Sequence, residues 1–364
     1  MDLLTTRIDL DAVAHNTRTI KQRVGAARLM AVVKADGYNH GAADVARVML
    51  AHGADALGVA TLAEAHGLRQ TGITAPLLAW IWSPGQDFRA ALAADIELGV
   101  STLAQVRALA DAAVPARVAV KVETGMHRSG LEESEWAQAL TTLQAASHIT
   151  VTGLFSHLSC ADDPGNPATD QQAATFRRAI DVARSLGLEV PVNHLCNSPG
   201  TLTRPDLHFD QVRVGVALYG LEPVPGRDHG LRPAMTWVGR ITAVKPIAPG
   251  EGSSYGLTWR ADKPGWLALV PCGYADGLPR AVQGHLDVGI GGHRYPQVGR
   301  VCMDQFVVDL GDNPHGVTAG DEAVIFGTGG MSATELAAAT GTINYEIVCR
   351  PTGRTRREIT GSES

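Results

Sequence analysis

Short apolar runs alternate with longer amphipathic segments through the first two thirds of the chain. The apolar runs are Arg28–Lys34, Ala56–Ala60, Pro76–Ile81, Ile96–Val100, Arg117–Glu123, Ile149–His157, Val190–Leu195 and Val212–Leu218. The segments between them carry apolar residues at three- and four-residue spacing, which is typical of helices. They include Gly41–His52, Thr61–Gln70, Leu103–Ala113, Glu132–Ala145 and Gln171–Leu186. Thr61 and Ser101 directly follow predicted strands, and we expect them to cap the next helices.

The repeated strand–helix units favour a closed barrel. Continuous apolar strands that alternate with helices indicate a parallel sheet that is buried on both faces. Because the sequence shows eight such strands and no ninth, a (β/α)8 TIM-type barrel is favoured over an open doubly wound sheet.

The pattern changes after Leu221, where a linker rich in proline and glycine begins. The β-like runs beyond it are Trp237–Val244, Trp266–Val270, Leu286–Ile290, Gln305–Leu310 and Glu322–Phe326. Each is bounded by glycine, proline or aspartate, as strands usually are, and only Ser332–Ala339 is predicted to be helical. The predicted fold class is therefore α/β, with a (β/α)8 barrel over residues 10–228 and a mostly antiparallel β domain over residues 229–364. We expect the N-terminal strand 1–9 to join the second domain.

Composition and charge narrow the classes of partner. The chain has 364 residues, of which 45% are hydrophobic and 19% charged, and its net charge is −6. This balance suits a globular protein, and the absence of a long basic run argues against nucleic-acid binding. No apolar stretch reaches the ~20 residues that span a bilayer, and the N-terminus does not resemble a signal peptide. The five cysteines form no CxxC pair, so we expect reduced thiols in the cytoplasm, no metal site, and small molecules as partners.

Polar residues gather at the predicted carboxyl ends of the strands, where barrel enzymes place their active sites. They are Lys34, Arg128, His157, Asn197 with Ser198, and Arg213. Lys34 closes an apolar strand, so its amine is expected at the barrel mouth. Burial lowers the pKa of a lysine amine and prepares it for Schiff-base chemistry. A lysine that merely extends to the surface is the alternative interpretation.

Nine segments, taken in order along nearly the whole chain, resemble the alanine racemases, a fold-type III family of enzymes that depend on pyridoxal phosphate. They are AVVKADGYNHG (31–41), KVETGMHRSG (121–130), GLFSHLSCAD (153–162), NHLCNSPG (193–200), VRVGVALYGL (212–221), SSYGLTW (253–259), GYADGLPR (273–280), GRVCMDQF (299–306) and INYEIVCR (343–350). The resemblance implies that the chain racemises L- and D-alanine and so supplies D-alanine for peptidoglycan.

The resemblance implies how the cofactor is held. Lys34 would bind pyridoxal phosphate covalently, and the phosphate would lie against Tyr38, Ser198, the backbone of Gly215, and Tyr345. Hydroxyl and amide donors suit a phosphate dianion. His194 matches a position near the pyridine ring, and Asn197 lies beside Ser198. From the residues alone, Asn197 and Ser198 fit a helix cap equally well, and His194 could be a core histidine.

The resemblance places Arg213 against the pyridine nitrogen. Since arginine only donates hydrogen bonds, this nitrogen would stay unprotonated, which favours return of the proton over transamination. A strand-end arginine that pairs with an acid is the alternative interpretation. Arg128 matches the arginine near the phenolic oxygen and the substrate carboxylate. Lys121 matches a lysine that is carbamylated in some members.

Racemisation needs a base on each face of the substrate Cα. Lys34 would supply one and Tyr255 the other, reaching the barrel mouth of a second subunit with help from His157 and Arg213. The active sites would then be shared within a homodimer. A free phenol has a pKa near ~10 and is a poor base without such help, and a tyrosine after two serines is commonly a surface turn residue. Met303 and Tyr274 match substrate-binding positions, although a methionine there could also be core.

Other functions remain open at this stage. They are a fold-type III decarboxylase, a broader-specificity racemase, a non-catalytic carrier of pyridoxal phosphate, and a Schiff-base aldolase without cofactor. Three features depart from the family pattern: Asn39 stands where glycine is common, Glu123 replaces an aspartate, and the tail 350–364 is unusually basic and irregular.

Overall fold

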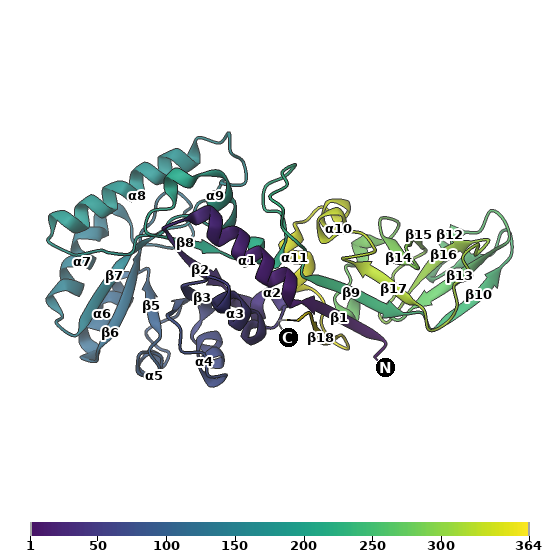
Figure 1. Cartoon of the computed structure of the whole chain (residues 1–364), viewed down its shortest axis with the longest axis horizontal. Coiled ribbons are helices and arrows are strands. Elements are labelled where there is room, and N and C mark those ends of the chain that lie inside the picture. Colours follow the sequence, from purple (N-terminus) through teal and green to yellow (C-terminus); the bar gives the residue numbers. More distant parts are fainter. Residues whose placement is uncertain (1, 363–364) are drawn as a thin grey trace.

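The computed structural model describes residues 2–362 and divides them into two lobes (Figure 1). In this range, seven parallel strands form the first sheet in the order β7-β6-β5-β4-β3-β2-β8. They are β2 (Arg28–Val32), β3 (Ala56–Thr61), β4 (Leu77–Ile81), β5 (Glu97–Val100), β6 (Ala116–Lys121), β7 (Ile149–Phe155) and β8 (Gln211–Val214).

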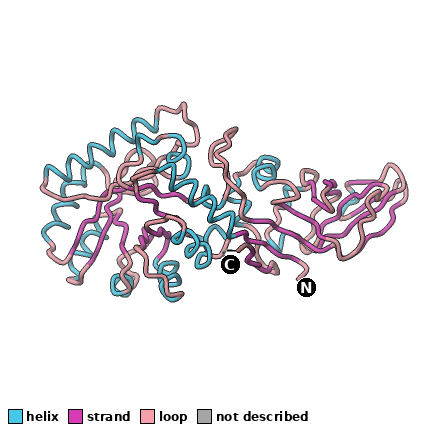
Figure 2. Tube along the Cα trace, in the orientation of Figure 1, coloured by secondary structure: helices cyan, strands magenta, loops and turns pink. Residues whose placement is uncertain are grey.

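The sheet curls into a barrel, and helices surround it (Figure 2). The helices of this lobe are α1 (Leu10–Val24), α2 (Lys34–Asn39), α3 (Ala42–Ala51), α4 (Leu62–Gln70), α5 (Phe88–Ala93), α6 (Leu103–Ala112), α7 (Trp136–Ala145), α8 (Ala168–Ser185) and α9 (Ser198–Thr203). Thr61 caps α4 as predicted, through a reciprocal bond pair with Glu64. The cap of α6 is Thr102 rather than Ser101, because Ser101 instead bonds Gln105 through its amide and hydroxyl.

The predicted strand Val190–Leu195 is the main correction to the barrel. This segment lies between β7 and β8 but makes only a single bridge, between Phe155 and His194. Pro191 has no N–H to donate, and the side chains of Asn193 and Asp210 take up backbone groups that a ladder would use. Hydrogen bonds from His194 to Leu154 and from Arg213 to Cys196 still close the ring.

The second lobe is a mostly antiparallel sheet, as predicted. Within residues 2–362 its nine strands run in the order β10-β13-β16-β15-β14-β17-β9-β1-β18. They are β1 (Leu4–Asp9), β9 (Met235–Arg240), β10 (Ala243–Ile247), β13 (Gly265–Val270), β14 (Asp287–Ile290), β15 (His293–Val298), β16 (Phe306–Gly311), β17 (Glu322–Phe326) and β18 (Arg356–Thr360). The lobe also contains a small ribbon, β11 (Gly252–Ser253) with β12 (Trp259–Arg260), two α-helices, α10 (Ala333–Thr340) and α11 (Asn344–Cys349), and several short 3-10 helices.

Several details of this lobe differ from the sequence prediction. The run Trp237–Val244 is split between β9 and β10, with Ile241 and Thr242 between them. Helix α11 was not predicted, and the basic tail is ordered as β18, which pairs in parallel with β1. β1 belongs to the second sheet but leads directly into α1 of the first lobe, so it connects the two lobes. β18, the last strand of the chain, pairs with β1 at this connection. In residues 2–362, no helix is both long and apolar enough to cross a membrane.

Candidate active site

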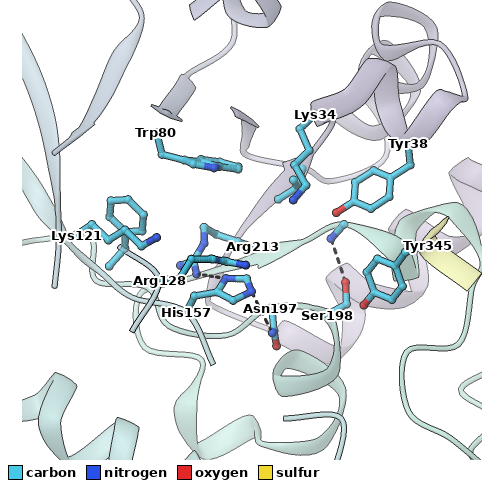
Figure 3. A pocket seen from close by; sticks show the side chains of 13 residues that line it. Lys34, Tyr38, Trp80, Lys121, Arg128, His157, Asn197, Ser198, Arg213 and Tyr345 are labelled. Atoms are coloured by element: carbon cyan, nitrogen blue, oxygen red, sulfur yellow. Dashed lines mark hydrogen bonds between the residues drawn. The ribbon is translucent and has the colours of Figure 1, made fainter. Parts of the chain in front are cut away.

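The carboxyl ends of the barrel strands open into a pocket (Figure 3). It is lined by Val32, Lys34, Tyr38, Trp80, Lys121, Arg128, Phe155, His157, Asn197, Ser198, Arg213, Gly215 and Tyr345. Ten of the site residues predicted from the sequence therefore lie together. No carboxylate is among these lining residues of the described chain, whereas two lysines and two arginines are. The pocket therefore has the electrostatic character of an anion-binding site.

Lys34 enters this pocket from an unusual turn. The five residues after it, Ala35–Asn39, all have positive φ angles between 52° and 67°, although only one is glycine. Left-handed backbone costs an L-residue about 1–2 kcal/mol, and such strain persists only where the surroundings enforce it. The amide of Ala35 donates to Glu64 (2.8 Å), and the Nδ1 of His40 bonds the carbonyls of Gly37 and Tyr38.

Burial and positive neighbours change the acidity of the two lysines. The pKa of Lys34 is lowered, first by burial and then by the charge of Arg128. The pKa of Lys121 is lowered to about 8, again mainly by burial, with added repulsion from Arg213 and Arg128. The Nζ of Lys121 donates to the hydroxyl of Ser129 at 2.5 Å. Both amines are therefore more readily deprotonated, and hence more nucleophilic, than exposed lysines.

Hydroxyl groups and backbone amides gather at one end of the pocket, where Tyr38, Ser198 and Tyr345 point toward one another (Figure 3). The hydroxyl of Ser198 accepts from the amides of Gly215 (3.0 Å) and Ala217 (3.4 Å). A side chain at Gly215 would collide with the hydroxyl of Tyr38, at 2.3 Å. Burial raises the pKa of both tyrosines, so their hydroxyls remain protonated donors. This end of the pocket can bind a phosphate group.

Arg213 lies fully buried between two histidines. Its Nη1 donates to the Nδ1 and carbonyl of His194 (2.9 and 2.8 Å), and its Nη2 donates to the carbonyl of Ser156. The same Nη2 lies 3.4 Å from the Nδ1 of His157. Burial lowers the pKa of Arg213 to about 10, which still leaves it charged at neutral pH. Its Nε has no protein acceptor within residues 2–362 and is the donor left for a ligand.

The neighbours of Arg213 are fixed as neutral acceptors. Burial and the charge of Arg213 keep the pKa of both His157 and His194 well below the usual value. Because arginine can only donate, the Nδ1 of His194 at 2.9 Å is an acceptor, which places the proton of that ring on Nε2. Both ring nitrogens of His157 face donors, since Arg213 lies 3.4 Å from its Nδ1 and Asn197 lies 3.5 Å from its Nε2. His194 stacks on Phe155 behind the pocket rather than lining it, so it supports Arg213.

Asn197 caps a helix, as one interpretation of the sequence predicts, and both Asn197 and Ser198 line the pocket. The side chain of Asn197 caps α9 by accepting from the amide of Gly200 (3.1 Å). The same residue faces the pocket, where its Nδ2 lies 3.5 Å from the Nε2 of His157. The cap therefore orients the loop that presents Ser198 to Gly215.

Trp80, Phe155 and Val32 also line the pocket, and the sequence analysis did not identify them. Trp80 lies near the end of β4, so its position at a strand end was the available signal. A side chain at Gly58 or Gly99 would contact Trp80 at 2.8 Å. The two glycines therefore make room for the flat Trp80 ring, which forms an apolar part of the pocket lining.

Tyr255, Tyr274 and Met303 do not lie in this pocket. All three are on the second lobe and are exposed, by 69%, 45% and 53% respectively. They belong to neighbouring loops, since the hydroxyl of Ser254 lies 3.4 Å from the Sγ of Cys302, whose carbonyl accepts from the amide of Tyr274 (3.2 Å). Exposed aromatic and thioether side chains in one group indicate a surface that another molecule covers.

The turn that carries Tyr255 is itself strained. Ser254, Gly256 and Leu257 all have positive φ angles, of 65°, 72° and 45°. The hydroxyl of Ser254 is tied to the carbonyl of Arg300 at 2.5 Å. Strain that is held in place this way is characteristic of functional loops, and here it presents the Tyr255 phenol to solvent.

Comparison with known proteins covers both lobes. A family model described as the alanine racemase N-terminal domain matches residues 8–223, and one described as the C-terminal domain matches residues 234–359. The alanine racemase of Corynebacterium efficiens is 70% identical over 364 residues, covering 99% of each chain. That of Mycolicibacterium smegmatis is 48% identical and covers 97% of this chain and 93% of its own.

Solved structures give the same result. The crystal structure of alanine racemase from Corynebacterium glutamicum superimposes with a TM-score of 0.91 at 56% identity, over 99% of this chain and 100% of that one. The enzyme from Streptomyces lavendulae superimposes with a TM-score of 0.95 at 41% identity, over 100% of this chain and 98% of that one. The similarity therefore extends over the second lobe as well as the barrel.

Proposed function

This chain belongs to the alanine racemase family. From that premise we propose that it interconverts L- and D-alanine with two bases, so that one of Lys34 and Tyr255 removes the Cα proton from one face and the other donates a proton to the opposite face. The observation that carries the proposal is the position of the Lys34 amine. It is half-buried beside the phosphate-binding end, in a pocket that has no carboxylate among its described lining residues. The match of both lobes to the family gives no support to a decarboxylase, to a barrel-only carrier, or to an aldolase without cofactor.

The described residues fit pyridoxal phosphate. Lys34 would bind its aldehyde carbon, and Tyr38, Ser198, Tyr345 and the Gly215 backbone would hold its phosphate. The contact that a Cβ at Gly215 would make with Tyr38 shows how closely the backbone and hydroxyl approach there. When bound, pyridoxal phosphate withdraws electrons from the substrate and acidifies its Cα proton.

Arg213 would face the ring nitrogen through its Nε. Since arginine donates and does not give up its proton at neutral pH, it leaves a ring nitrogen unprotonated. Electron withdrawal is then moderate, which favours return of a proton to Cα over transamination. His194 and the Ser156 carbonyl hold the guanidinium in this orientation.

Replacing Arg213 with glutamate tests that role. We expect slower racemisation and a larger share of pyruvate, because a carboxylate would keep the ring nitrogen protonated. The control is Arg213→Lys, which preserves a cationic donor. Pyruvate is measured by a coupled reduction, and a pyruvate share that is equal in both variants and the parent would refute the role.

Arg128 would receive the substrate carboxylate, and Lys121 would orient it. We propose that Lys121 is carbamylated, because its lowered pKa of about 8 supplies neutral amine that reacts with carbon dioxide. The negative carbamate would offset part of the charge of three neighbouring cations, Lys34, Arg128 and Arg213. The intact mass of the native protein, and of a Lys121→Met variant, would show one added carbon dioxide in the parent alone. A parent of unmodified mass would contradict this.

The second base would come from another copy of the chain. Lys34 is inside the barrel mouth and Tyr255 is exposed on the other lobe, so one chain offers one base to its own pocket. We infer a homodimer in which the loops of Tyr255, Tyr274 and Met303 cover the partner's pocket. His157, which lies beside Arg213 in the lining of the pocket, would then hydrogen-bond the incoming phenol and favour its ionisation. A cytoplasmic location and the supply of D-alanine for peptidoglycan are parts of the proposal that rest on family membership.

The reaction itself is tested with L-alanine in deuterated water. We expect optical rotation to fall to zero while deuterium enters Cα in both enantiomers. Loss of rotation without deuterium, or unchanged L-alanine, would overturn the proposed reaction. A wider substrate range is examined by repeating the measurement with L-serine.

A further inference from the structure

The strained turn after Lys34 is fastened to the end of the second lobe. Arg357, on the last strand β18, donates through Nη2 to the carboxylate of Asp36 at 2.6 Å. The same nitrogen lies 3.3 Å from the carbonyl oxygen and from the side-chain oxygen of Asn39. One guanidinium group thus contacts two of the five left-handed residues, more than 300 positions away in the sequence.

Asn39 makes further hydrogen bonds from the turn to the second lobe. Its Nδ2 donates to the carbonyls of Pro351 (2.8 Å) and Val348 (3.3 Å). Val348 belongs to α11, the helix that also carries Tyr345 into the phosphate-binding end of the pocket. The rings of Tyr38 and Tyr345 lie 6.3 Å apart. Asn39 therefore joins the turn of Lys34 and Tyr38 to the helix of Tyr345.

Side chains of the barrel lobe bond only part of the turn Ala35–Asn39. From within the barrel lobe, Glu64 bonds the amide at the start of the turn, and His40 bonds carbonyls in its middle. The other oxygen of the Asp36 carboxylate accepts from the amide of Ala42 (2.8 Å), which orients it toward Arg357. The Asn39 side chain is satisfied by groups of the second lobe.

We propose that Asp36, Asn39 and Arg357 form a C-terminal clamp that positions Lys34 and Tyr38 for the cofactor. The clamp explains two of the departures from the family pattern, the asparagine in the lysine loop and the basic tail. It rests on the proposed function, because its consequence is measured at Lys34. Arg357 and Asn39 are positioning residues, since they act through the backbone of the turn and do not line the pocket.

The test compares three variants. Arg357→Met removes the guanidinium and keeps the aliphatic stem. Asn39→Gly removes the side-chain bonds while glycine accepts the φ of 67°. The control is Arg356→Met, one residue earlier on the same strand, where the side chain points to the opposite face. The readouts are the dissociation constant of pyridoxal phosphate, from titration of visible absorbance, and the thermal unfolding of cofactor-free protein.

We expect Arg357→Met and Asn39→Gly each to weaken cofactor binding roughly fivefold, as for loss of a half-exposed ion pair of about 1 kcal/mol. Arg356→Met should bind as the parent does. The three unfolding midpoints should agree, because the clamp acts on the turn and not on the core. Because the side chains act through one turn, Arg357→Met with Asn39→Gly should bind no worse than the weaker single variant.

Three results would overturn the clamp: unchanged cofactor binding in both variants, an equal loss in Arg356→Met, or a loss that follows a lowered unfolding midpoint. A parent protein that never acquires visible absorbance with pyridoxal phosphate would instead refute the proposed function. The two failures are therefore distinguishable.

Discussion

Replacing Lys34 with alanine is expected to abolish both racemisation and the visible absorbance that pyridoxal phosphate acquires on the protein. Lys34 is the amine that faces the phosphate-binding end of the pocket (Figure 3), and burial lowers its pKa. Its loss would remove both the proposed covalent anchor and one of the two proposed bases, so activity and visible absorbance should disappear together. Activity is measured by polarimetry and the anchor by absorbance after removal of free cofactor.

The control for this variant is Lys245→Ala, on the exposed strand β10. It should retain both signals at the level of the parent. Visible absorbance retained in Lys34→Ala would show that another amine anchors the cofactor. Lys121 would then be the next candidate, because it is the other lysine of the lining.

Replacing Tyr255 with phenylalanine is expected to slow turnover by about 10²–10⁴-fold, the usual contribution of a positioned general acid or base. Tyr255 is not among the residues that would hold the cofactor, so cofactor binding and visible absorbance should be unchanged. Abstraction of the proton from L-alanine should suffer most, as measured by initial rates in each direction and by uptake of solvent deuterium.

Tyr295→Phe is the matched control. Tyr295 lies buried in the same lobe, and its hydroxyl has no partner within residues 2–362. Removing that hydroxyl should leave turnover unchanged. Equal turnover of Tyr255→Phe and the parent in both directions would remove Tyr255 from the mechanism.

The barrel lobe could be predicted because its elements are defined locally. Apolar runs such as Leu29–Val33 and caps such as Thr61 depend on residues that are adjacent in sequence. The absence of a regular strand at Val190–Leu195 could not be predicted, because it results from Pro191 and from long-range hydrogen bonds between Asn193 and Asp210. The basic tail likewise forms the strand β18 only because it pairs with β1, which lies at the other end of the chain.

The site divides along the same line. Lys34, Ser198 and Arg213 follow from their positions at strand ends, and the resemblance to a family added Tyr38 and Tyr345. Neither source identified Trp80, whose orientation is determined by the space that Gly58 and Gly99 leave. The left-handed turn was also hidden, since its residues other than glycine rarely adopt positive φ.

A mixed dimer of Lys34→Ala and Tyr255→Phe subunits tests the central claim most directly. If each pocket takes Lys34 from one chain and Tyr255 from the other, the mixed dimer contains one intact pocket and one with both defects. Each variant alone should show little or no turnover, whereas the purified mixed dimer should turn over alanine at about half the rate of the parent, because one of its two pockets is intact. A mixed dimer as inactive as the two single variants would contradict the account, because both bases of each pocket would then come from one chain.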